Sequence, residues 1–195
     1  MDPDYKAGLA IAAAAAVGAL VLGPGGGLAR LTDGPVQGGV VAAMADKWGR
    51  VFGVPSSWIL AIAKVESGLR PAARSASTAR DELRGGAWGA MQVTLRTAAG
   101  LAAELAKNTD RTVALTFAKW NGTGAALQDA DVGVMFGAYL LSKLARQFGP
   151  DFSKVAAAYN QGPGTVSKLI AANNWPAGLT AHGRDYVTKT SEALA

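Results

Sequence analysis

The chain has 195 residues, of which 50% are hydrophobic and 17% charged, which suits one folded domain with a short appendage and excludes a disordered chain. Lysine and arginine exceed aspartate and glutamate by five charges. This excess favours a polyanionic partner such as nucleic acid, anionic lipid or an acidic cell wall, without choosing among them. Cysteine is absent and His182 is the sole histidine, so thiolate chemistry is excluded and we expect no metal and no cofactor.

No charged residue occurs between Lys6 and Arg30. An alanine-rich stretch that ends near Leu22 predicts an apolar helix, and the glycines and prolines of residues 23–39 predict a linker after it. The apolar part is short for a bilayer span, which takes about 20 residues, and it lacks the basic start and the cleavage site of a signal peptide. Three interpretations stay open: a membrane-active or assembly-docking helix, a retained signal anchor, or an ordinary buried helix.

Beyond this linker the hydrophobic pattern is helical. The segment Val54–Ser57 predicts a helix start, with a proline in the first turn and hydroxyl caps beside it, and Gly68 predicts its end. Gly162–Gly164, with a central proline, predicts a turn. The helices that we expect cover residues 40–52, 57–67, 95–106, 132–148, 151–159, 166–172 and 184–194. The predicted fold class is therefore all-α, with one mainly helical domain over residues 36–195 that follows an apolar helix and Gly/Pro linker over residues 1–35.

Glu66 is placed so that its side chain faces the apolar side of the helix that ends at Gly68. Ile62 and Ala63 lie four and three residues earlier, on the same face, whereas Lys64 points nearly the opposite way. A carboxyl among aliphatic groups loses hydration of its charged form, which raises its pKa and keeps it protonated near neutral pH, ready to act as an acid. The alternative interpretation is a carboxylate that bends to solvent or pairs with Arg70.

Four segments carry a family pattern when they are taken in order. They are Glu66 to Ser75, Gly86 to Gln92 with its Gly-Ala-Met-Gln sequence, Ala157 to Gly164 with its Ala-Tyr-Asn sequence, and Tyr186 with Val187. This set resembles the signature segments of the soluble lytic transglycosylase family, relatives of goose-type lysozyme. One segment alone would be weak evidence, whereas four ordered matches are specific. The resemblance implies a lysozyme-like domain.

The resemblance also implies roles for individual residues. Glu66 matches the catalytic acid/base of the family. The positions that match substrate-binding residues are Ser75, Met91, Gln92, Tyr159, Asn160 and Tyr186, the last being the tyrosine whose hydroxyl orients the catalytic carboxyl. The implied reaction cleaves the β-1,4 bond between N-acetylmuramic acid and N-acetylglucosamine in peptidoglycan, with Glu66 first as acid and then as base. It leaves a 1,6-anhydromuramyl end and consumes no water.

Three departures from the family pattern leave other interpretations open. Residues 76–85 are inserted after the serine segment, and a solvated loop is the plain interpretation of them. If Asp81 or Glu82 covered the cleft, a second carboxyl would activate water and make the enzyme a muramidase, which is a hydrolase. Trp88 replaces an aliphatic residue and either stacks on a sugar or fills the core. His182 stands where an acid-threonine pair is usual, and we expect it in a surface or loop position.

A non-catalytic wall- or membrane-docking assembly protein, and a membrane- or DNA-handling protein with wall cleavage as an accessory, are functions of other classes that stay open. The implied partners are peptidoglycan glycan strands and, through residues 1–35, a membrane or a larger envelope-spanning or virion assembly. No specific nucleic-acid recognition is predicted. The expected location is the wall-facing cell envelope or a phage virion, where the enzyme would open the wall locally during genome entry.

Overall fold

The computed structural model describes residues 34–75 and 86–194 of the chain. The apolar helix and most of the linker predicted for residues 1–35 lie outside this part, as does the inserted segment of residues 76–85, so what we expect of them stays a prediction. From Val36 onward the chain forms one compact unit. In the described ranges, no helix combines the length and the apolar character that crossing a membrane requires.

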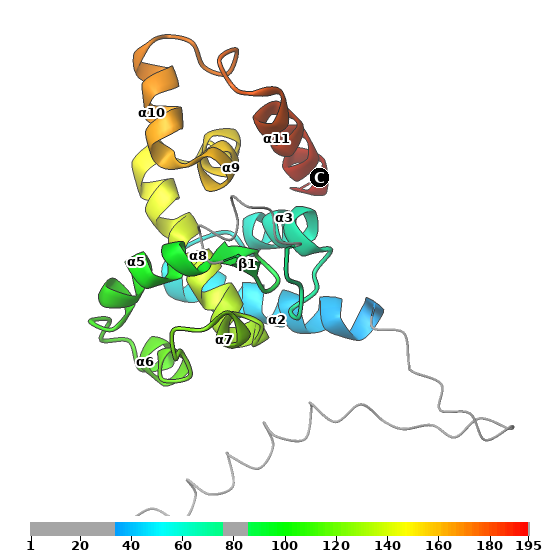
Figure 1. Cartoon of the computed structure of the whole chain (residues 1–195), viewed down its shortest axis with the longest axis vertical. Coiled ribbons are helices and arrows are strands. Elements are labelled where there is room, and N and C mark those ends of the chain that lie inside the picture. The colour runs from blue at the N-terminus through cyan, green and yellow to red at the C-terminus, as the bar shows by residue number, and fades with distance from the viewer. Residues whose placement is uncertain (1–33, 76–85, 195) are drawn as a thin grey trace, which may run out of the picture. The chain divides into compact units, whose positions relative to one another are not determined.

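The described residues are mainly helical, which confirms the predicted all-α class (Figure 1). The helices are α2 (Gly34–Phe52), α3 (Ser56–Ser67), α5 (Leu95–Leu105), α6 (Arg111–Phe117), α7 (Gly124–Leu127), α8 (Ala130–Phe148), α9 (Phe152–Gln161), α10 (Pro163–Ala171) and α11 (Ala181–Leu194). Strands β1 (Ala87–Trp88) and β2 (Val93–Thr94) form an antiparallel hairpin in which Trp88 pairs with Val93. The sequence pattern did not predict β1, β2, α6 or α7.

Helix α3 ends where the sequence predicts, but it begins differently. Gly68 follows its last residue in the left-handed conformation, with φ of 65°, and its N–H donates to the carbonyl oxygen of Lys64. At the other end Pro55 occupies the N-cap position and no side chain caps the helix. The predicted hydroxyl caps are therefore wrong, because both Ser56 and Ser57 already lie inside the helix.

Helix α2 begins at Gly34, although residues 34–39 were expected to belong to the linker. Its fully buried residues Val41, Ala45 and Trp48 follow helical spacing, and this tertiary packing outweighs the low helix propensity of the glycines before them. The turn predicted around Pro163 is likewise shorter than expected. Gly162, with φ of 87°, makes the turn alone, and Pro163 already begins α10.

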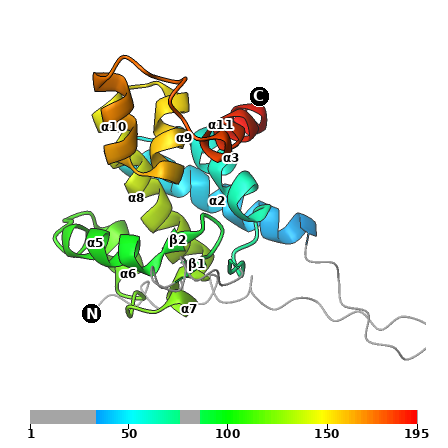
Figure 2. The same ribbon diagram turned by 45° about the horizontal axis from the view of Figure 1, so that its top comes forward.

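Helix α8 crosses the described unit, with α9 at one end and α6 and α7 near the other (Figure 2). Most of its residues from Val132 to Leu144 are buried, so the core forms around it. Helix α11 lies against both α3 and α9 in the two views (Figures 1 and 2). Helix α11 thus comes within reach of both the end of α3 and α9, which positions the candidate site.

Candidate active site

Glu66 lies in the last turn of α3, next to the core. Ile62 and Ala63, on the same face, are fully buried, whereas Lys64 is exposed, as the helical spacing predicts. Glu66 itself is only partly exposed. Its carboxyl therefore sits at the boundary between the aliphatic core and the surface, where it loses much of its hydration.

Tyr186, from α11, holds this carboxyl. Its hydroxyl donates a hydrogen bond of 2.6 Å to Oε1 of Glu66, and only 5% of the tyrosine is exposed. Arg70 does not pair with Glu66 in the described part of the chain, because its Nε donates to the carbonyl oxygen of Ser67. The structure therefore does not support a glutamate that is paired with Arg70 at the surface.

The pKa of Glu66 is shifted towards neutrality. It is raised from 4.5 to about 7, because burial outweighs the opposing effect of the hydrogen bond from Tyr186. The pKa of Tyr186 is raised well above 10 by burial and by the negative charge on Glu66, so its hydroxyl stays protonated. Near pH 7 the carboxyl therefore populates both the form that gives a proton and the form that takes one.

Tyr159, from α9, responds to the charge of Glu66. Burial and the charge of Glu66 both raise the pKa of this tyrosine well above 10, which places it within the electrostatic reach of the carboxyl. Its hydroxyl donates a 2.8 Å hydrogen bond to the carbonyl oxygen of Met91. Two neutral phenols, Tyr159 and Tyr186, thus neighbour one titratable acid.

Met91 and Gln92 belong to the turn that joins β1 and β2. This turn requires Gly89, whose φ is 78° and where a Cβ would lie 2.1 Å from the carbonyl oxygen of Leu127. The Met91 side chain is fully buried and packs so closely on Gly137 that a Cβ there would lie 2.2 Å from its Sδ. Gln92 adopts φ of 47° and its Nε2 donates to the Gly89 carbonyl oxygen. Met91 therefore binds Tyr159 through its backbone carbonyl, while its side chain packs in the core.

Ser75 and Asn160 make their hydrogen bonds elsewhere. The N–H of Ser75 donates to the carbonyl oxygen of Ala87, and its Oγ accepts from the Ala87 N–H, so Ser75 extends the β1–β2 ribbon. Asn160 follows Tyr159 on α9, with its Nδ2 3.5 Å from Nε2 of His182. His182 is exposed, as expected, and lies on α11 and not in a loop. The recorded contacts thus join Glu66 to Tyr186 and Met91 to Tyr159, while Ser75 and Asn160 have other partners.

Ser67 is a residue of this region that the sequence analysis did not single out. It directly follows Glu66 and is 5% exposed. Its Oγ lies 2.7 Å from the carbonyl oxygen of Ala90 and 3.1 Å from that of Ala63, and it accepts the N–H of Arg70. The only signal in the sequence was its place inside the first family segment.

Trp88 packs against the core and is partly buried. Its indole fills the space that a side chain at Gly124 would need, since a Cβ there would lie 2.1 Å from Cε2. The guanidinium carbon of Arg74 lies 4.4 Å from the centroid of the Trp88 ring. The tryptophan that was open to two interpretations therefore has a packing role in this structure.

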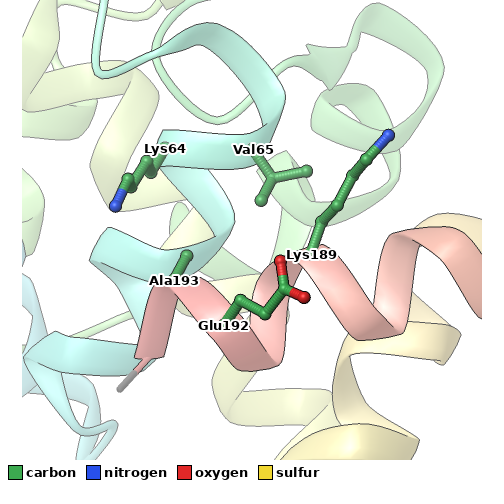
Figure 3. A pocket seen from close by; sticks show the side chains of 5 residues that line it. All are labelled: Lys64, Val65, Lys189, Glu192 and Ala193. Carbon is green, nitrogen blue, oxygen red and sulfur yellow. The ribbon is translucent and has the colours of Figure 1, made fainter.

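A surface hollow between α3 and α11 is lined by other residues of these two helices (Figure 3). Lys64, Val65, Lys189, Glu192 and Ala193 line its volume of about 320 Å³. It contains none of the predicted site residues. Across the described ranges, no group of three or more acidic or histidine side chains is placed to hold a metal ion.

A helical domain that desolvates a carboxyl at the end of one helix, and orients it with a tyrosine from another, has the arrangement expected of a lysozyme-like, glycan-cleaving enzyme. The family model described as the transglycosylase SLT domain matches residues 43–180. The chain therefore belongs to this transglycosylase family, within the lysozyme-like superfamily, which confirms the resemblance. Tyr186 lies just beyond the matched range. No curated protein matches the chain.

Membership defines the function in general terms. The family supports peptidoglycan as the substrate and a lytic-transglycosylase type of cleavage as the activity.

Proposed function

We propose that this protein cleaves the β-1,4 bond between N-acetylmuramic acid and N-acetylglucosamine as a lytic transglycosylase, with Glu66 as its acid and base. The observation that carries the proposal is the state of the Glu66 carboxyl. Burial raises its pKa to about 7 while a neutral hydroxyl, that of Tyr186, fixes one of its oxygens. A carboxyl in this state is able both to give and to take a proton at neutral pH.

In the first step, protonated Glu66 gives its proton to the glycosidic oxygen and the bond to C1 of the muramyl sugar breaks. Because Tyr186 donates to Oε1, the other carboxyl oxygen is left for the exchange with substrate. The N-acetyl group of the muramyl sugar stabilises the positive charge that develops at C1. The leaving N-acetylglucosamine end takes the proton, and Glu66 becomes a carboxylate.

In the second step, carboxylate Glu66 takes the proton of the muramyl 6-hydroxyl, whose oxygen attacks C1 of the same sugar. This closes the 1,6-anhydro ring and returns Glu66 to its protonated form, so no water is consumed. Since the nucleophile is tethered to the reacting carbon, the enzyme needs only to orient it. We assign this orientation, from the family pattern, to Ser75, Met91, Gln92, Tyr159 and Asn160, with Met91 acting through its backbone and packing.

The products of digestion test the proposal. Purified sacculi treated with the full chain should release muropeptides with anhydro ends. Mass spectrometry would detect each of them at about 18 Da below the corresponding reducing product, because an anhydro end lacks one water. Reducing ends would refute the transglycosylase mechanism and favour the muramidase alternative, with a carboxyl of residues 76–85 activating water. Binding of sacculi without any released product would favour a non-catalytic docking protein.

We further propose that the enzyme works on the wall-facing side of the cell envelope or within a phage virion, with residues 1–35 docking it to a membrane or an assembly. The location of the substrate and the uncharged stretch between Lys6 and Arg30 support this setting. Leakage from anionic lipid vesicles caused by the full chain, but not by residues 36–195 alone, would support docking to a membrane. Equal leakage with the full chain and with residues 36–195 would count against docking to a membrane through residues 1–35.

A further inference from the structure

The last residue of α3 is tied to the β1–β2 turn from inside the protein. The hydroxyl of Ser67 is buried, and its shorter contact, 2.7 Å, is with the carbonyl oxygen of Ala90. The Ser67 Oγ also accepts the N–H of Arg70, which fastens the backbone that leaves the helix. One side chain thus connects the end of the Glu66 helix to the turn and to the following segment.

The connection continues from the turn to α9. Ala90 is followed by Met91, whose carbonyl oxygen accepts the hydroxyl of Tyr159. The turn has little freedom to move independently, because the Met91 side chain is buried against Gly137. Two hydrogen bonds and the Ala90–Met91 peptide unit therefore connect Ser67 to Tyr159. Ser67 is the residue after Glu66, and Tyr159 has a pKa that responds to the charge of Glu66.

We propose that Ser67 is a positioning residue for the reaction: through Ala90 and Met91 it sets the place of the Tyr159 hydroxyl beside Glu66. This inference rests on the proposed function. Ser67 does not act on substrate, because its Oγ is buried and bonded to the backbone. It keeps the turn closed over the end of α3, which limits the water that reaches the carboxyl.

The groups that face Glu66 make the pH profile a suitable readout. Among the described elements packed on α3, Tyr186 of α11 bonds to the carboxyl, and Tyr159 of α9 responds to its charge. The described residues place no ion pair on Glu66, while residues 76–85, which include Asp81 and Glu82, lie outside the described part. A turn that loosens would therefore change the pKa of Glu66 mainly through hydration, which lowers it.

The decisive variant is Ser67→Ala, with Ser142→Ala as its matched control. Ser142 is also buried, at 3% exposure, and its Oγ donates to the Tyr139 carbonyl oxygen within α8, a bond that includes no residue of the site. Both variants lose one buried hydroxyl, so both should lower the melting temperature. Only Ser67→Ala should reduce kcat, roughly 10- to 100-fold, with little change in KM, and move the pH limb assigned to Glu66 towards lower pH.

A second measurement tests the path itself. Ser67→Ala and Tyr159→Phe break the same path at its two ends, so the double variant should lose hardly more kcat than the more affected single variant. Ser67→Cys replaces Ser67→Ala in both comparisons if the alanine variant does not fold. Equal kcat and pH profiles for the variants at Ser67 and Ser142, or multiplicative effects in the double variant, would overturn the inference.

The wild-type digest separates this inference from the proposed function. A wild-type protein that releases no anhydro product contradicts the proposed function itself. A wild-type protein that releases it, while the Ser67 variant behaves like the Ser142 variant, contradicts only the positioning role.

Discussion

Two partly buried carboxyls, Glu66 and Asp131, show opposite responses to the same loss of water. Burial alone would raise the pKa of both. At Asp131 this effect is outweighed by the hydrogen bond and charge of Lys47, so the pKa falls below its usual value of 3.8. At Glu66 the partner is the neutral hydroxyl of Tyr186, and burial prevails.

The partners explain the difference. Asp131 accepts hydrogen bonds from Nζ of Lys47 at 2.7 Å, from Nε1 of Trp48 at 2.9 Å and from the hydroxyl of Thr116 at 3.0 Å. These donors come from α2 and α6, so an ionised Asp131 joins both helices to the start of α8. A carboxyl with a cationic partner is thus a permanent structural charge, whereas one with a phenol partner stays ready to exchange a proton.

Removing the acid at Glu66 should have the largest effect. Glu66→Gln keeps the shape of the side chain but deletes the exchangeable proton, so turnover of sacculi should fall roughly a thousandfold or more, about 4 kcal/mol on the barrier. The rate of release of muropeptides measures this. Folding should be preserved, because the amide removes the energetic cost of burying a charge.

Glu104→Gln is the matched control for this change. Glu104 is an exposed glutamate whose partners are Lys143 and Tyr139. Neither partner is a residue of the site. Its variant should digest sacculi at the wild-type rate. If Glu66→Gln also retained that rate, Glu66 would not be the acid.

The corresponding change at Asp131 should affect stability and not chemistry. Asp131→Asn leaves Lys47 without its nearest carboxylate and weakens three hydrogen bonds, so the free energy of unfolding should fall by about 2–4 kcal/mol. Urea denaturation at pH 7 measures the loss. Asp185→Asn, which breaks an exposed pair with Lys189, should cost less than about 0.5 kcal/mol.

The pH dependence of this stability has a definite sign. Because folding lowers the pKa of Asp131, its contribution is present above the usual value of 3.8 and is lost as the pH falls through the lower folded value. The wild type and Asp131→Asn should therefore converge in stability in acid. A constant difference between them down to pH 2 would show that ionisation is not the cause.

The two carboxyls also differ in how much of their surroundings the sequence predicts. The position of Glu66 on the apolar face follows from local spacing and from Gly68, which ends the helix, and both are confirmed. Tyr186 lies 120 residues from Glu66 in the sequence, so helical spacing cannot connect the two. Only the family resemblance predicted that this tyrosine orients the carboxyl. Asp131 looks like an ordinary acid in the first turn of a helix, and its burial depends on the packing of α2 and α6.

Other features escaped prediction because they are short or tertiary. Helix α7 has four residues and the strands two each, too few for a hydrophobic period to be visible. The bond from Ser67 to Ala90 crosses 23 residues and is decided by how the turn packs, not by either residue type. Local pattern thus placed Glu66 on the apolar face and the family resemblance supplied Tyr186, whereas the bond from Ser67 required the folded chain.

Tyr186→Phe should reduce turnover less than Glu66→Gln does. The variant removes a hydrogen-bond donor from Glu66, whereas Asp131 keeps all of its donors. Among the residues that the structure describes, the lost hydrogen bond is the one contact that lowers the pKa of Glu66, so this pKa should rise above about 7. The fall in kcat/KM with rising pH, which reports loss of the protonated acid, should therefore move to higher pH. Turnover at pH 7 should drop roughly tenfold, about 1–2 kcal/mol, since the carboxyl is less well oriented.

Tyr139→Phe separates this effect from the general loss of a phenol hydroxyl. Tyr139 also donates to a carboxylate, at 2.9 Å to Oε2 of Glu104, but that pair is exposed and remote from Glu66. Its variant should keep the wild-type pH profile. A shift to lower pH in Tyr186→Phe would mean that the missing hydroxyl admits water to Glu66, and that the tyrosine acts on the acid chiefly by excluding solvent.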